Sequence, residues 1–396
     1  MNKWARLCFL ILGGGTIFKL SSMKDVFYVP MQNDWGLTNT QIGLSFTVYT
    51  IVQTTGLFLS LYIADRYSKK ILLPLGLIGV GLCGLYLATL PSFTGYLICF
   101  AAMAFFADVV YWPVLLKAVR LLGTKEEQGR MFGFLEAGRG VVDVIVASGA
   151  LFVFVHFGEG KAGMQAGLLF YTLITIAAGI VTYFIVDNDE VKGGEKTSAN
   201  MEVLKGIKHV LSCPNVWLAS LGIFFVYAAY CGLTYFIPFL KDIYMLPVAL
   251  VGAYGIINQY PTVYLKWTFL ISAVAMLVFM QLPHQTMNVY IGMAATLGFG
   301  AIIFSQRAIF FAPMDEIGTP REYAGSAMAF GCIIGYMPAM FAYTLYGYLL
   351  DTNSGITGYN YVFSVMIAFS LMGFICSTIL VKRIKNQKLA AAAAAT

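Results

Sequence analysis

The chain has 396 residues, of which 59% are apolar and only 11% are charged. Soluble domains carry about 25% charged residues, so this composition nearly excludes a water-soluble enzyme and indicates an integral membrane protein. A net charge of +6 fits basic cytoplasmic loops in such a protein, and no nucleic-acid partner is expected.

Apolar runs bounded by Gly, Pro and charged residues predict the membrane spans, because a bilayer core about 30 Å thick needs about 20 apolar residues per helix. The first run follows basic residues without a cleavage site and is expected to be a membrane helix rather than a removable signal. The predicted fold class is all-α integral membrane, with twelve transmembrane helices in two six-helix bundles at 5–32, 39–63, 71–90, 95–122, 130–156 and 163–186, then 215–240, 247–261, 265–283, 287–313, 322–350 and 359–381.

One long hydrophilic stretch, 187–213, separates the two sets of runs and predicts a cytoplasmic linker. It divides an amino-terminal bundle, 1–186, from a carboxyl-terminal bundle, 214–388. The last residues, 389–396, read LAAAAAAT and are interpreted as a tail or linker scar. The eighth span ends early, near Tyr260. From Gly252 to Trp267 the chain takes 15 residues, whereas the matching segment of the first half, Gly43 to Ile71, takes 28, so we expect about a dozen residues to be absent there. The alternative is a short re-entrant helix.

Basic residues are distributed unevenly between the connections on the two sides of the membrane. The two termini and the connections expected on their side hold 19 of the 25 Lys and Arg residues. The positive-inside rule therefore predicts that both termini are cytoplasmic.

Two short matches relate the halves. The tripeptide YVP at 28–30 matches FIP at 236–238, each followed by Asp four residues after the Pro, and GTKEEQGRMFGF at 123–134 resembles GTPREYAGSAMAF at 318–330. Matches in corresponding places predict duplication and a pseudo-twofold relation between the bundles, a pattern typical of secondary transporters.

The connection between the second and third spans, LYIADRYSKK at 61–70, resembles the signature loop GxxxDRxGRR of the major facilitator superfamily. Leu61 and Ser68 stand where the family usually has Gly. In that family the loop helps to hold the two bundles in the outward-facing state. The resemblance therefore implies a conformational gate formed by Asp65, Arg66 and Lys69.

Further motifs resemble one group of enterobacterial inner-membrane transporters within the superfamily: GGGTIFKL at 13–20, YWPVLLK at 111–117, FGFLEAGRG at 132–140 and the run at 224–260. The resemblance implies a multi-pass, monomeric protein of the bacterial inner membrane that binds a small-molecule substrate. No GxxxxGK[ST] sequence is present to couple ATP, so protons are the expected second partner. The seven cysteines lack metal-ligand spacing, and neither a metal nor a cofactor is expected.

Charged residues inside the spans indicate where the substrate site lies, because each costs about 2.5–3.5 kcal/mol at the bilayer centre. Counting along the spans places Lys19, Asp108 and Asp143 near the midplane, where alternating-access transporters bind their substrates. We expect Lys19 to pair with Asp108 or with Asp143, and substrate or proton binding to exchange with that pair.

The fifth span carries Glu136, Arg139 and Asp143 at positions i, i+3 and i+7, a spacing that predicts one helix face on which Arg139 reaches both carboxylates. In the functional interpretation one carboxylate takes up a proton, and the proton-coupling set is Asp108, Asp143, Glu136 and Arg139. The alternative is a structural ladder of ion pairs.

Two more cations are candidates for binding an anion, Lys24 in the first span and Arg307 in the tenth. The alternative for Lys24 is a side chain that extends to the outer interface, with Asp25 pairing locally. The alternative for Arg307 is a structural pair with Asp315, Glu316 or a carbonyl. Tyr227 matches Lys19 in the repeat, which predicts that the two face each other. The uncharged candidates for substrate binding are Tyr227, Tyr230, Gln53, Trp112, Asn258 and Gln259, each with ordinary helix packing as the alternative.

These features favour a secondary active transporter for a small polar, anionic organic solute such as a sugar acid, sugar phosphate or sulfonate, coupled to protons. The alternative is a proton-coupled efflux antiporter for drugs or metabolites, which the many aromatic and Met residues favour and which the intramembrane cations oppose. An enzyme is not expected, because neither HExxH nor GxSxG occurs. A sensor without transport activity is the remaining alternative.

Overall fold

The computed structural model describes residues 3–122, 127–186, 211–236, 239, 262–283, 289–310, 313–317 and 324–394. Every regular element in these ranges is a helix, as the composition predicts. The chain divides into two compact units, Met1–Gly194 and Glu195–Thr396, and the boundary between them falls inside the predicted linker.

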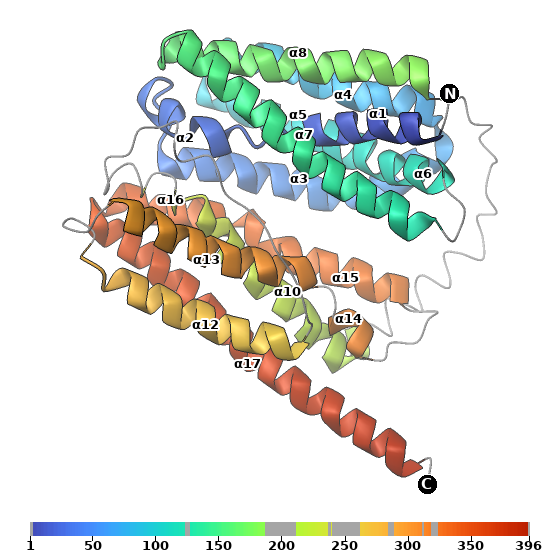
Figure 1. The fold of residues 1–396 in the computed structure, drawn as a ribbon, viewed down its shortest axis with the longest axis vertical. Helices are drawn as coiled ribbons and strands as arrows, with labels where there is room; N and C mark the ends of the chain where they lie inside the picture. The colour runs from blue at the N-terminus through green and yellow to red at the C-terminus, as the bar shows by residue number, and fades with distance from the viewer. Residues whose placement is uncertain are drawn as a thin grey trace. The chain divides into compact units, whose positions relative to one another are not determined.

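The first unit is a bundle of long helices that lie side by side (Figure 1). Within it α4 packs along α8, and α1 packs against both α7 and α8. Its elements are α1 (Lys3–Thr16), α2 (Lys24–Asn33), α3 (Asn39–Arg66), α4 (Lys69–Leu87), α5 (Phe93–Ala104), η1 (Phe105–Tyr111), α6 (Trp112–Leu122), α7 (Gln128–His156) and α8 (Lys161–Ile185).

Two of the predicted spans in this unit are interrupted. The span at 5–32 is broken between α1 and α2, where three consecutive glycines, the weakest helix formers after Pro, end at Gly15. The span at 95–122 widens into a π-helical turn, η1, just before Pro113, which lacks the amide needed for a regular helical bond. Both interruptions carry a charged residue, Lys19 in the first and Asp108 in the second.

The second unit contains α10 (Pro214–Leu233), α12 (Thr262–Met280), α13 (Val289–Ile309), α14 (Pro313–Glu316), α15 (Ala324–Tyr336), η4 (Met337–Met340), α16 (Ala342–Thr352) and α17 (Ile356–Ala394). Pro338 lies in η4, the short 3-10 turn that divides the predicted span at 322–350. The helix α17 extends past the predicted end at 381 and beyond the end of α12 (Figure 1).

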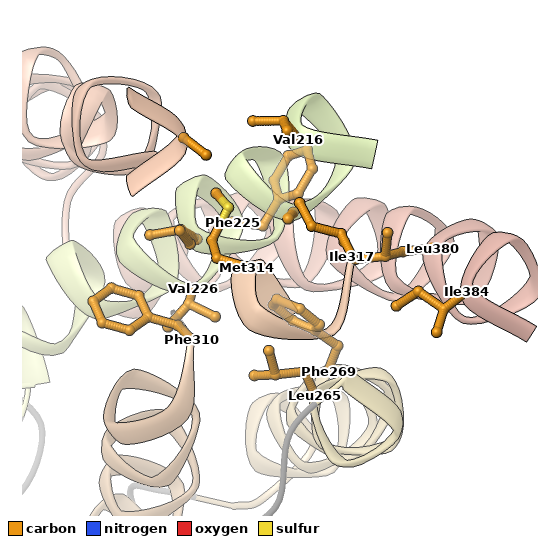
Figure 2. Close-up of a cluster of buried hydrophobic side chains, with 13 residues drawn as sticks. Val216, Phe225, Val226, Leu265, Phe269, Phe310, Met314, Ile317, Leu380 and Ile384 are labelled. Carbon is orange, nitrogen blue, oxygen red and sulfur yellow. The ribbon is translucent and has the colours of Figure 1, made fainter. Parts of the chain in front are cut away.

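A cluster of buried apolar side chains packs several helices of this unit against one another (Figure 2). The short helix α14 contributes Met314 to a core that α10, α12 and α17 surround. Four of the members, Val216, Phe269, Val226 and Leu265, are at most 1% exposed. The cluster fixes the segment that follows α13, the helix that carries Arg307.

Seven helices in the described part of the chain are long and apolar enough to cross a membrane, among them α4, α8 and α17. The predicted eighth span, 247–261, with its suspected truncation near Tyr260, lies outside the described residues, as does most of the linker at 187–213. Residues 237–238 of the first repeat match and 318–323 of the second also fall outside them.

Candidate substrate and proton site

The break between α1 and α2 lies at Lys19, inside the first unit. The Lys19 amide donates to the carbonyl of Thr16 at 3.0 Å, three residues back instead of the usual four. Backbone groups freed inside a membrane need other partners. Two carbonyls beside the break accept a side-chain hydroxyl in addition to a backbone amide: Thr175 donates to the Thr16 carbonyl at 3.4 Å, and Ser21 to the Phe18 carbonyl at 2.9 Å.

One carbonyl that the break frees is that of Gly14, and an arginine from α7 bonds it. Arg139 Nε donates to the Gly14 oxygen at 3.0 Å. Arg139 Nη1 donates to both carboxylate oxygens of Glu136 at 2.9 and 3.0 Å. The guanidinium also lies 4.4 Å from the ring centre of Trp112, in cation–π geometry. This one side chain therefore links the broken helix, α7 and α6.

Lys19 forms an ion pair with Asp143, one turn further along α7 from Arg139. Of the two partners considered for Lys19, the structure thus shows Asp143 and not Asp108. The expectation that Arg139 reaches both carboxylates of α7 is wrong for this conformation, because Arg139 pairs with Glu136 while Lys19 takes Asp143. The i, i+3 and i+7 spacing places the three residues on one face of α7. It could not show that the break in the first helix brings Lys19 to Asp143.

Among the described residues, both hydrogen-bond partners of the Asp108 carboxylate are uncharged groups. The carboxylate accepts from the Tyr49 hydroxyl and from Gln53 Nε2, the latter at 2.8 Å. Both donors come from one face of α3, since they are four residues apart. The site combines an acid on a π-helical turn with two donors on a neighbouring helix, and π turns occur frequently at functional sites.

Lys24 begins α2 and is buried, with its side chain 7% exposed. Its ammonium lies 3.2 Å from an Asp25 carboxylate oxygen and 4.5 Å from the ring centre of Phe46. Of the alternative for Lys24, the local pairing of Asp25 is present, whereas the extension to the outer interface is not, because the lysine side chain is buried. Trp112, a candidate stacking surface for a sugar, has Arg139 on a face of its indole.

In the second unit, the guanidinium of Arg307 lies against tyrosine rings. Arg307 of α13 lies 4.0 Å from the ring centre of Tyr230 and 5.8 Å from that of Tyr227, both on α10. Tyr336 closes the group, with its ring 4.8 Å from Tyr227. Among the described residues no carboxylate pairs with Arg307. Aromatic faces hold the cation without neutralising it.

The remaining expectations for this second group fall outside what the structure describes. The side chains of Asp315 and Glu316 are not described, and neither are Asn258 and Gln259. The expected approach of Tyr227 to the first half joins two units that are described separately, so it stays a prediction.

The connection between α3 and α4 has the backbone form of a capped turn. Ser68, which stands where the family usually has Gly, is the N-cap of α4 and accepts from the Lys70 amide at 3.3 Å. Lys69 is the first residue of α4. The side chains of Asp65 and Arg66 lie outside the described part of the structure, so the gate they were assigned to remains a prediction.

Sequence reasoning missed three residues of these groups, and all three are aromatic. Tyr49 donates to Asp108, Phe46 faces Lys24, and Tyr336 packs on Tyr227. Tyr49 could have been found, because it precedes the candidate Gln53 by one helical turn. Phe46 and Tyr336 carry no comparable signal in a chain with 31 Phe and 24 Tyr.

The fold and the motifs define the class of protein. The family model of the Major Facilitator Superfamily matches residues 21–342, and the chain belongs to this family. The predicted all-α membrane fold class and the family resemblance are thereby confirmed.

Individual relatives narrow the assignment further. The chain is 49% identical to the inner membrane protein YihN of Escherichia coli (strain K12), with 98% of this chain and 97% of that protein aligned. It is 27% identical to the inner membrane protein YqcE of the same organism, over 100% of this chain and 98% of that one. A bacterial homologue of the human lysosomal transporter Spinster, solved inward-facing and unoccupied, shares the fold at a TM-score of 0.72 and 15% identity, covering 96% of this chain and 98% of that one.

The resemblance to enterobacterial inner-membrane transporters is thus confirmed at the level of YihN. That alignment spans 413 positions against the 396 residues of this chain, so the relative carries residues that this chain lacks.

Proposed function

We propose that this transporter of the Major Facilitator Superfamily moves a small polar, anionic organic solute (a sugar acid, sugar phosphate or sulfonate) by alternating access, coupled to protons across the bacterial inner membrane with both termini cytoplasmic. The observation that carries the proposal is the ion pair between Lys19 and Asp143 at the break in the first helix. A buried lysine at an interrupted membrane helix is the kind of group that binds an anion near the midplane.

The proposed step is an exchange of partners at Lys19. An anionic solute takes the place of the Asp143 carboxylate, which at 55% exposed is the less buried partner of the pair. Asp143 then lacks its counter-charge, and a proton is the simplest replacement. The binding of the solute and the binding of a proton are coupled at this pair.

Two other groups contribute to the proposed function. Arg307, held by tyrosines without a carboxylate partner among the described residues, supplies a second cation for the solute. Asp108, held by Tyr49 and Gln53, is a second candidate for proton binding. Glu136 forms an ion pair with Arg139 in this conformation and is not assigned a proton-binding role.

A thermal-shift screen of the purified protein tests the substrate class. The panel contains glucuronate, glucose 6-phosphate and a three-carbon sulfonate, with uncharged glucose and the lipophilic cation tetraphenylphosphonium as comparisons, at two pH values. We expect an anionic member to raise the unfolding temperature. Stabilisation by tetraphenylphosphonium alone would instead support the efflux antiporter.

A further inference from the structure

The arginine on α7 is engaged by three different groups: a backbone carbonyl, a carboxylate and an aromatic ring. Arg139 Nε bonds the Gly14 carbonyl at 3.0 Å, its Nη1 bonds Glu136, and its plane lies 4.4 Å from the Trp112 ring. Its side chain is 21% exposed. A group with this set of partners is suited to fixing a geometry, because moving it breaks several interactions together.

Close approach of the two helices at this point depends on glycine. A Cβ on Gly14 would lie 3.2 Å from Arg139 Cδ and 3.0 Å from Leu115 Cδ2. A Cβ on Gly15 would lie 2.6 Å from Val142 Cγ1, closer than real side chains pack. The glycines therefore let the last turn of α1 lie against α7, within hydrogen-bond distance of the Arg139 side chain.

The contact at Gly14 and the ion pair at Lys19 are geometrically coupled. Arg139 and Asp143 lie one turn apart on α7, and their two partners lie on either side of the point where α1 ends at Thr16. A shift of the first contact therefore displaces the second.

We propose that Arg139 is a positioning residue: its guanidinium bonds the Gly14 carbonyl freed by the break in the first helix, and so holds Lys19 where it meets Asp143. The proton-coupling role first considered for Arg139 is not needed. The significance for transport rests on the proposed function of Lys19, but the positioning itself is measurable without any solute.

The test is hydrogen–deuterium exchange of the full chain in lipid nanodiscs, measured on peptides that cover 17–23. Arg139→Met removes the donor at similar side-chain length, and we expect these amides to exchange at least about tenfold faster, as the loss of a charged hydrogen bond implies. Arg139→Lys, which keeps one charged donor, should restore part of the protection. Glu136→Gln is the matched control: it removes the ion pair and leaves the Gly14 bond, so exchange at 17–23 should stay near the wild-type rate.

Wild-type exchange in Arg139→Met, or equally fast exchange in Glu136→Gln, would overturn the proposal. If Arg139→Met does not fold, Gly14→Ala pushes the helices apart at the same contact and should raise exchange at 17–23, and wild-type exchange there overturns the proposal as well. A Lys19→Gln variant that still binds the anionic solute would refute the proposed function while leaving the exchange result intact.

Discussion

Lys19 and Asp143 form an ion pair of unequal partners, because the side chain of Lys19 is 7% exposed whereas that of Asp143 is 55% exposed. Removing either partner therefore leaves the other in a different environment. An uncompensated buried charge is strongly destabilising, and Lys19 is the more deeply buried of the two.

The first prediction follows from this asymmetry. Asp143→Asn leaves a buried ammonium without its carboxylate and should lower the unfolding temperature more than Lys19→Gln, which leaves the less buried carboxylate. Thermal unfolding of the two variants in the same detergent checks this. Equal destabilisation, or the reverse order, would show that Asp143 does not compensate Lys19.

The second prediction concerns the glycines at the end of α1. Gly15→Ala places a Cβ 2.6 Å from Val142 Cγ1 and 3.2 Å from the Arg139 carbonyl oxygen, so the backbone of α7 must shift, and the protein should be destabilised. Gly140→Ala is the matched control on α7, since a Cβ there meets nothing within 4 Å. Alanine is better than Gly in a helix by about 1 kcal/mol, so this control should be neutral or stabilising. A destabilised control together with a neutral Gly15→Ala would contradict the packing described.

Asp108 gives a third prediction, on coupling. Asp108→Asn keeps the shape of the side chain but cannot carry the negative charge, and should abolish accumulation driven by a pH gradient while exchange of labelled and unlabelled solute continues. Uptake into proteoliposomes, with the solute identified by thermal shift, measures both activities.

The control for this experiment is Glu159→Gln, an exposed acid in the turn between α7 and α8, which should leave both activities unchanged. Tyr49→Phe removes one of the two donors and should weaken gradient-driven uptake only in part. Normal accumulation by Asp108→Asn would remove this residue from the coupling set.

The tyrosines around Arg307 supply a fourth prediction. A cation–π contact shielded from water is worth about 2 kcal/mol, which corresponds to about thirtyfold in affinity. Tyr230→Leu removes the ring that lies 4.0 Å from Arg307. We expect this variant to bind the solute at least about tenfold more weakly than the wild type. Tyr230→Phe keeps the ring and should bind nearly as the wild type does. If the Phe variant were as weak as the Leu variant, the hydroxyl rather than the ring would be the important group.

Much of the fold could be predicted from the sequence, because lipid leaves few alternatives. A chain with so little charge must form apolar helices, and their limits follow from Gly, Pro and charged residues. The described helices α4, α7 and α8 begin within two residues of the predicted spans at 71–90, 130–156 and 163–186. The intramembrane charges were visible for the same reason.

The interruptions of helices could not be predicted in the same way. GGGT at 13–16 reads as part of a continuous apolar run, and glycine is common in membrane helices. Only the packing of Gly14 and Gly15 against α7 shows why the chain needs them. The choice of Asp143 over Asp108 as the partner of Lys19 depends on that break, since it sets the position of the lysine relative to α7.

The central claim, that an anionic solute exchanges with Asp143 at Lys19, is tested most directly by calorimetric titration with the solute in two buffers of different ionisation enthalpy. The difference between the buffers reports protons taken up on binding. We predict that wild-type protein takes up a proton with the anion, that Asp143→Asn binds the anion without proton uptake, and that Lys19→Gln loses binding, whereas Lys161→Gln at the exposed start of α8 behaves as wild type. Anion binding by Lys19→Gln with wild-type affinity, or identical proton uptake in the Asp143→Asn variant, would contradict the account.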